Sequence, residues 1–128
     1  MQFKECYQNP FIEERADPYI TLGPDGFYYF TASYPMKSAD DKDGYDRVIL
    51  RRAKDISELA SAEEITIWKV ADTTLTHRFI WAPELHYIAG RWYVFYAGSE
   101  DKENNWAFDC HVLVCDSDDP YTGTWSEK

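Results

Sequence analysis

The sequence is poor in basic residues and lacks long apolar runs, and each lack excludes a class of protein. Lysine and arginine number 13 against 23 aspartates and glutamates, so the formal net charge is −10. Nucleic acids and anionic membranes both bind clustered basic side chains, so neither is expected as a partner. No stretch is apolar for long enough to cross a bilayer, and the chain does not begin with the basic and then apolar residues of a signal peptide.

Cysteine is also scarce, with three residues at positions 6, 110 and 115. They cannot all pair with one another, and the odd spacing of Cys110 and Cys115 places their side chains on opposite faces of a strand. Neither a disulfide framework nor a zinc site is therefore predicted, and no metal site is expected. A reduced, cytoplasmic protein that binds a neutral ligand is the simplest interpretation of these features, and a secreted protein is the alternative if the sequence is truncated.

Aromatic residues, by contrast, are abundant, at 17% of the chain. They gather in the strand-like runs 27–30 and 92–96, which lack the polar alternation of a sheet with one solvated face. Such strands are expected to be covered on both faces. A chain of 128 residues can bury roughly two thirds of its unfolded surface, so its length is sufficient for a core.

An internal repeat organises the chain. The residues that precede two similar proline motifs, Asp17 and Ala82, are 65 positions apart, and the turn glycines Gly26 and Gly90 are 64 apart. A period of this length, built of short strands, favours radially repeated four-stranded sheets, the blades of a β-propeller. The fold class predicted is therefore all-β.

The repeat also predicts the strands and the domain organisation. A lead-in segment (1–15) precedes a first blade (16–75), and a second, incomplete blade (76–128) follows. The fourth strand of the first blade has its counterpart beyond Lys128, so the chain is interpreted as the N-terminal portion of a larger molecule. The predicted strands lie near 17–22, 27–33, 47–53, 65–70, 82–88, 91–97 and 110–116, and a helical turn capped by Asp55 or Ser57 is predicted within 55–64.

Proline near the start of each repeat predicts an edge strand, because proline cannot donate to a ladder. In a propeller the innermost strand of each blade is such an edge, and the residue before proline is expected to be extended. Asp17 would then point into the central channel. Glu84 lies two positions after the counterpart of Asp17, so the two carboxylates are expected to converge on one cavity.

Two convergent carboxylates beside aromatic rings suit glycoside hydrolysis, in which acids manage the leaving-group proton and the attacking water while rings stack on sugars. Each residue also has a structural alternative. Asp17 could simply form a turn, Glu84 could accept main-chain N–H bonds, and Trp81 could be a core side chain. The repeat strengthens the functional interpretation of Asp17.

Several separated motifs, in order, strongly resemble glycoside hydrolase family 43, and the resemblance runs from about Asn9 to Lys128. It is closest to the exo-acting α-L-arabinofuranosidases of the family. The residues that carry it are Arg15-Ala16-Asp17-Pro18-Tyr19-Ile20, Asp25-Gly26-Phe27-Tyr28-Tyr29-Phe30-Thr31-Ala32-Ser33, Asp46-Arg47-Val48-Ile49-Leu50-Arg51-Arg52-Ala53 and Ile80-Trp81-Ala82-Pro83-Glu84-Leu85-His86.

The resemblance implies a five-bladed β-propeller, of which this chain covers about the first two blades, and inverting removal of terminal α-L-arabinofuranosyl units from arabinan or arabinoxylan. It implies that Asp17 is the general base and that Trp81 and Glu84 form part of the sugar subsite. The general acid and a second acid belong to later blades, so this chain alone is expected to be inactive. No cofactor is required.

A rival interpretation is a non-catalytic carbohydrate-binding or self-assembling propeller fragment. The expected ligand in either case is an arabinose- or xylose-containing oligosaccharide. Incomplete blades leave apolar faces and unpaired edges, so a homo-oligomer, or a complementary chain that carries the remaining blades, is also expected.

Overall fold

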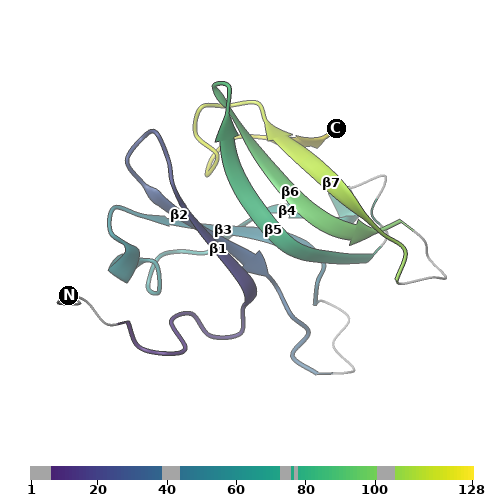
Figure 1. The fold of residues 1–128 in the computed structure, drawn as a ribbon, viewed down its shortest axis with the longest axis horizontal. Helices are drawn as coiled ribbons and strands as arrows, with labels where there is room; N and C mark the ends of the chain where they lie inside the picture. The colour runs from purple at the N-terminus through teal and green to yellow at the C-terminus, as the bar shows by residue number, and fades with distance from the viewer. Residues whose placement is uncertain (1–6, 39–43, 73–75, 77, 101–105) are drawn as a thin grey trace, which may run out of the picture.

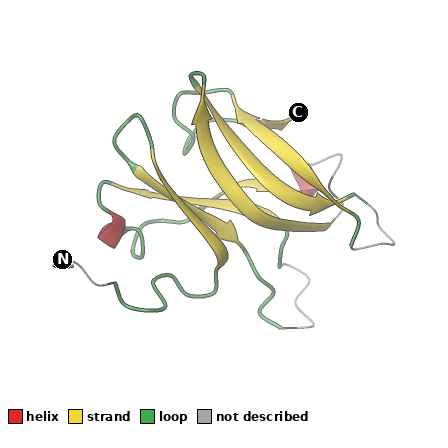
Figure 2. Cartoon of the chain, in the orientation of Figure 1, coloured by secondary structure: helices red, strands yellow, loops and turns green. Residues whose placement is uncertain are grey.

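The computed structural model describes residues 7–38, 44–72, 76, 78–100 and 106–128. These residues form an all-β structure, as the sequence predicted (Figure 2). The first sheet has the order β1-β2-β3-β4 and the second the order β5-β6-β7-β8, with every pair antiparallel. The elements are β1 (Ala16–Leu22), β2 (Tyr28–Ser33), β3 (Arg47–Ala53), η1 (Ile56–Glu58), β4 (Ile65–Lys69), η2 (Val70–Asp72), β5 (Arg78–Ile88), β6 (Arg91–Ser99), β7 (Phe108–Cys115) and β8 (Trp125–Glu127).

The strand β8 corrects one expectation, because the second repeat was predicted to lack its fourth strand. Trp125 pairs with Cys115 of β7, and its side chain is buried. The loop between β7 and β8 is closed by main-chain hydrogen bonds, since the N–H of Asp116 donates to the carbonyl of Thr124 and that of Gly123 to the carbonyl of Asp119. The chain therefore returns to the sheet earlier than the repeat offset indicates. The blade boundaries stay predictions.

Both proline-bearing strands, β1 and β5, lie at the edge of their sheets, as predicted. The expectation that the preceding residue is extended is wrong, because Asp17 has φ 49° and Ala82 has φ 45°. Each residue lies within a register shift of its own strand pair. A bulge lets the strand pass a position at which proline offers no ladder donor, and the left-handed residue makes that bulge.

The main core lies between the two sheets. Figure 1 shows β5, β6 and β7 beside one another, passing across the strands of the first sheet, and the side chains in between form one buried cluster. Its centre contains Tyr29 of the first sheet against Trp92 of the second, with ring centroids 5.1 Å apart. A Cβ on Gly23 would lie 2.9 Å from the Trp92 ring, so this turn needs glycine for the close approach of the sheets.

The opposite face of the first sheet is covered by the lead-in segment. Phe11 and Ile12 pack against a second buried cluster that contains Phe30, Ile49 and Leu59. The prediction of coverage on both faces is thus confirmed for the run 27–30, which lies largely in β2. It holds only in part for β6, in which buried residues alternate with half-buried ones.

The predicted helical turn within 55–64 is confirmed. Asp55 caps η1, and its side chain accepts from the N–H of Ser57. Cys110 and Cys115 are free thiols, the first exposed and the second buried, and Cys6 lies outside the described residues. No helix within the described ranges is long and apolar enough to span a membrane.

Candidate active site

Asp17 lies at the start of β1, at the boundary between the two sheets. Its side chain is exposed on one side, and its Oδ2 accepts a 2.9 Å hydrogen bond from the Ser33 hydroxyl at the end of β2. The Ser33 Oγ in turn accepts a 2.7 Å bond from the N–H of Ala82 on β5. One buried hydroxyl therefore connects the carboxylate to the second sheet.

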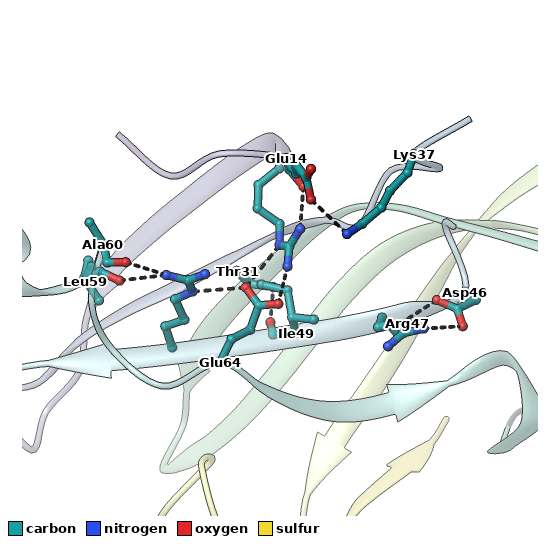
Figure 3. Close-up of polar contacts among 11 residues, drawn as sticks. Glu14, Thr31, Lys37, Asp46, Arg47, Ile49, Leu59, Ala60 and Glu64 are labelled. Atoms are coloured by element: carbon teal, nitrogen blue, oxygen red, sulfur yellow. Dashed lines mark hydrogen bonds and ion pairs between the residues drawn. The ribbon is translucent and has the colours of Figure 1, made fainter. Parts of the chain in front are cut away.

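The chain that leads into Asp17 is fixed by an ion-pair network around Glu64, which precedes β4. Arg15, two residues before Asp17, donates to both carboxylate oxygens of Glu64, and Arg51 of β3 donates to Oε2 at 3.0 Å. Figure 3 shows the Glu64 carboxylate with dashed lines that mark these bonds. The carbonyls of Leu59 and Ala60 also accept from Arg51, at 3.2 and 2.9 Å.

The charge state of Glu64 follows from these contacts. Burial alone would raise the pKa of this carboxyl, but the hydrogen bonds and charges of Arg15 and Arg51 outweigh burial and hold the pKa below its ordinary value. Arg15 also lies over the Tyr34 ring, 4.3 Å from its centroid. The strand entry that carries Asp17 is therefore held by charge pairing and by a cation–π contact.

Trp81 lies in a group of aromatic side chains that comes from three separate segments. Its ring stacks on Phe108 of β7 with centroids 4.3 Å apart and an interplanar angle of 22°. Tyr45, Phe79 and Trp106 lie 5.6, 5.2 and 6.2 Å from it. We call these five residues the aromatic wall. Trp106 is 80% exposed, so the wall ends in an open aromatic surface.

Two residues of the aromatic wall, Tyr45 and Phe79, share an unusual backbone conformation with Asp17 and Ala82; Glu14 and Ala89, which lie outside this boundary, also adopt it. Positive φ occurs at Asp17, Tyr45, Phe79 and Ala82, with values between 45° and 58°. Left-handed backbone costs of order 1–3 kcal/mol at a non-glycine residue and is rare for a bulky one such as Phe79. Strain of this kind clusters at functional sites, which supports this boundary as the site.

Glu84 is exposed and bonds to a neighbour on its own strand. Its Oε2 lies 3.0 Å from the His86 Nε2, and the His86 ring packs near Tyr19 of β1 at 5.3 Å. Glu84 lines a shallow hollow of about 230 Å³ together with Ala82, Phe95, Tyr96, Ala97 and Cys110. Asp17 is not among these lining residues, so the convergence of the two carboxylates on one cavity stays a prediction.

Sequence reasoning missed two parts of this site. Ser33 is an ordinary serine at the end of an aromatic run, and only its position opposite the proline motif of the other repeat could have singled it out. Phe108 and Tyr45 could not be assigned to the wall, because they are far from Trp81 in sequence. In the parts of the chain that the structure describes, no group of three or more His, Cys, Asp or Glu side chains is placed to hold a metal ion.

Two repeated four-stranded antiparallel sheets, with an edge-strand carboxylate and an aromatic wall at their boundary, form the arrangement expected of neighbouring β-propeller blades. The sequence comparison agrees. The chain belongs to the glycosyl hydrolases family 43, whose family model matches residues 7–128.

Similar proteins support the same family. The chain is 43% identical over 122 residues to an extracellular exo-α-(1→5)-L-arabinofuranosidase of Streptomyces avermitilis, covering 95% of this chain and 24% of that enzyme. It is 42% identical to the α-L-arabinofuranosidase 43 of Humicola insolens, covering 95% and 23%. The crystal structure of an α-L-arabinofuranosidase from Lactobacillus brevis matches with a TM-score of 0.78 and 40% identity, covering 94% and 37%.

These relatives also show how much of a whole enzyme the chain corresponds to, and they correct the predicted cellular compartment. The chain spans between 23% and 37% of the length of the three relatives, and thus corresponds to a portion of each. Two Streptomyces relatives are named extracellular enzymes, so the prediction of a cytoplasmic protein is wrong. That prediction rested on the composition of the first residues and on unpaired cysteines, and neither is a guide to compartment here.

Proposed function

We propose that this chain forms the first two blades of a five-bladed, inverting glycosidase in which Asp17 is the general base. The observation that carries the proposal is the Asp17 carboxylate, which is held at the boundary of the two sheets by the Ser33 hydroxyl at 2.9 Å. A base that activates water must be ionised and oriented. Asp17 is the acidic residue of the proline motif that opens the first repeat, and its side chain is exposed to solvent.

In this reaction a water molecule attacks the anomeric carbon from the face opposite the leaving group, and Asp17 takes its proton as the bond forms. A general acid must protonate the leaving oxygen at the same time, and inverting enzymes place the two carboxyls about 6.5–9.5 Å apart to accommodate the water. The acid comes from a residue outside this sequence. Trp81 packs against the sugar ring, and Glu84 accepts hydrogen bonds from its hydroxyls.

The proposed substrates are terminal α-L-arabinofuranosyl units of arabinan or arabinoxylan side chains. The names of the relatives support this class, since each is an arabinofuranosidase and the Streptomyces enzyme is named as acting on α-(1→5) linkages. The aromatic wall supports a sugar ligand independently, because aromatic faces provide apolar area for the C–H face of a ring.

A second candidate is a carbohydrate-binding protein without hydrolytic activity. The 80% exposure of Trp106 favours it, because an open aromatic side chain beside a stacked pair can bind sugars without any acid machinery.

The deciding experiment compares Asp17→Asn with Glu84→Gln in the natural full-length protein that contains this chain. With 4-nitrophenyl α-L-arabinofuranoside, Asp17→Asn is expected to lower kcat by roughly 10²–10⁴-fold with little change in KM, because a base acts in the transition state. Glu84→Gln, an isosteric change of an exposed carboxylate, is expected to affect KM more than kcat.

Two results would overturn the proposal. Near-normal kcat in Asp17→Asn would show that another group is the base. Retention of the anomeric configuration in the first-formed sugar, read by proton NMR, would exclude the inverting mechanism. Sugar binding without turnover in the unmutated protein would favour the second candidate.

A further inference from the structure

Ser33 occupies a position that the reaction described above does not yet use. It is the last residue of β2, its side chain is fully buried, and it pairs with Ala16 of β1 in the sheet register. Its hydroxyl makes the 2.9 Å bond to Asp17 Oδ2 and receives the 2.7 Å bond from Ala82 N–H. The two partners belong to different sheets.

The chemistry of these groups fixes the direction of both bonds. A main-chain N–H can only donate, so the Ser33 oxygen accepts from Ala82. A hydroxyl has a single hydrogen, and a carboxylate can only accept, so that hydrogen is directed at Asp17 Oδ2. Each bond polarises the next in such a chain, which strengthens the hold on the carboxylate.

The two ends of this chain are the two left-handed bulge residues, Asp17 and Ala82. Both lie within register shifts, where the regular ladder is interrupted. Ser33 therefore joins the irregular points of the two proline-bearing strands. Ala82 directly follows Trp81, which belongs to the aromatic wall. The Ser33 hydroxyl therefore links the position of the Asp17 carboxylate to the position of the wall.

The bond also distinguishes the two oxygens of the carboxylate. Oδ2 is engaged by Ser33, whereas no hydrogen bond to Oδ1 is found among the residues that the structure describes. The hydrogen bond from Ser33 stabilises negative charge on Oδ2, which leaves Oδ1 as the more basic oxygen. Oδ1 is thus the atom left to accept a proton from water.

We propose that Ser33 is a positioning residue, which fixes Asp17 through Oδ2 so that Oδ1 faces the attacking water. This inference rests on the proposed role of Asp17 as general base. Ser33 itself touches neither the substrate nor the water and acts only through Asp17. The role predicts a loss in turnover rather than in substrate binding when the hydroxyl is removed.

The test is Ser33→Ala in the natural full-length protein, with Thr31→Val as the matched control. Thr31 lies on the same strand, is equally buried, and its Oγ1 donates to the carbonyl of Ile49 at 2.7 Å without contacting the site (Figure 3). Both changes remove one buried hydroxyl and its hydrogen bond, so both are expected to lower the melting temperature. We expect only Ser33→Ala to lower kcat, by roughly 10–100-fold with KM within about 2-fold, as for a misplaced catalytic group.

A double-mutant cycle separates this inference from the proposed function. If Ser33 acts through Asp17, adding Ser33→Ala to Asp17→Asn is expected to change kcat by less than about 3-fold. Equal kcat values for Ser33→Ala and Thr31→Val, or a full additional loss in the double variant, would overturn the positioning role while leaving Asp17 as base. Normal kcat in Asp17→Asn alone would instead overturn the proposed function.

Discussion

Replacement of Glu64 by glutamine is expected to weaken the folded state in a way that depends on pH. The side chain is 18% exposed, and the side chains of its partners Arg15 and Arg51 are 11% and 14% exposed, so the three charges are largely removed from solvent. Glutamine preserves the volume, but it loses the negative charge and turns an N–H₂ group towards guanidinium donors.

The magnitude follows from the contacts that are lost. A hydrogen bond to a charged group contributes about 1.5–3 kcal/mol, and glutamine retains one oxygen that can still accept from one guanidinium. A net loss of about 2 kcal/mol of unfolding free energy at pH 7 is therefore expected. With a urea slope of about 2 kcal/mol per molar, the midpoint would fall by about 1 M.

The pH dependence has a definite sign. The folded pKa of Glu64 lies below its ordinary value, because the two arginines outweigh burial. A depressed carboxyl pKa stabilises the folded state at pH values above the unfolded pKa, about 4.3 for glutamate. This stabilisation is lost as pH falls through the folded pKa. The difference between Glu64→Gln and the unmutated protein is therefore expected at neutral pH and should shrink below about pH 4.

Urea unfolding followed by tryptophan fluorescence at pH 7 and pH 3 measures both effects. Glu63→Gln is the matched control, since the Glu63 side chain is exposed and only its main-chain carbonyl is used, as acceptor for the Tyr121 hydroxyl at 3.0 Å. Equal losses for Glu64→Gln and Glu63→Gln at pH 7 would refute the reasoning, as would a difference that persists undiminished at pH 3.

Two further substitutions test the contact between the sheets and the aromatic wall. Asp119→Asn removes the charge that accepts two bonds from Arg52, at 2.8 and 3.0 Å. Because the pair is partly exposed, the change is expected to lower the free energy of unfolding by about 0.5–1 kcal/mol. Asp118→Asn should be near neutral in the same urea titration, and equal effects of the two changes would contradict this reasoning. Trp81→Leu removes the ring that stacks on Phe108. It should raise KM for an arabinofuranoside by about 10-fold, with a smaller change in kcat. An unchanged KM would exclude Trp81 from the sugar subsite.

The turns and the edge strands could be predicted because local chemistry determines them. Proline cannot donate to a ladder, so Pro18 and Pro83 require edge strands, which β1 and β5 are. The turn before Phe27 needed a residue that accepts positive φ, and Gly26 has φ 77°. The near-constant repeat offset then predicted the counterparts of β1, β2 and β3 in the second sheet, but not β8.

The candidate site was predictable only in part. The motifs identified Asp17 as the acid to examine, and they identified Trp81 and Glu84 as its neighbours along the chain. They could not show that Asp17 bonds to Ser33, that Glu84 bonds to His86, or that Trp81 stacks on Phe108. Bulge geometry decides where these side chains lie, and a bulge shifts the alternation on which sequence reasoning depends.

By itself, the sequence determined the all-β class, the repeat, the edge strands and the family, because each depends on residue type at short or regular spacing. Only the tertiary structure decided that the lead-in segment covers the first sheet, that a short β8 completes the second, and that Asp17 and Ala82 are left-handed. The link from Asp17 through Ser33 to Ala82 belongs to this second group. Its members are far apart in the chain, and their meeting depends on how two sheets pack, which no local pattern encodes.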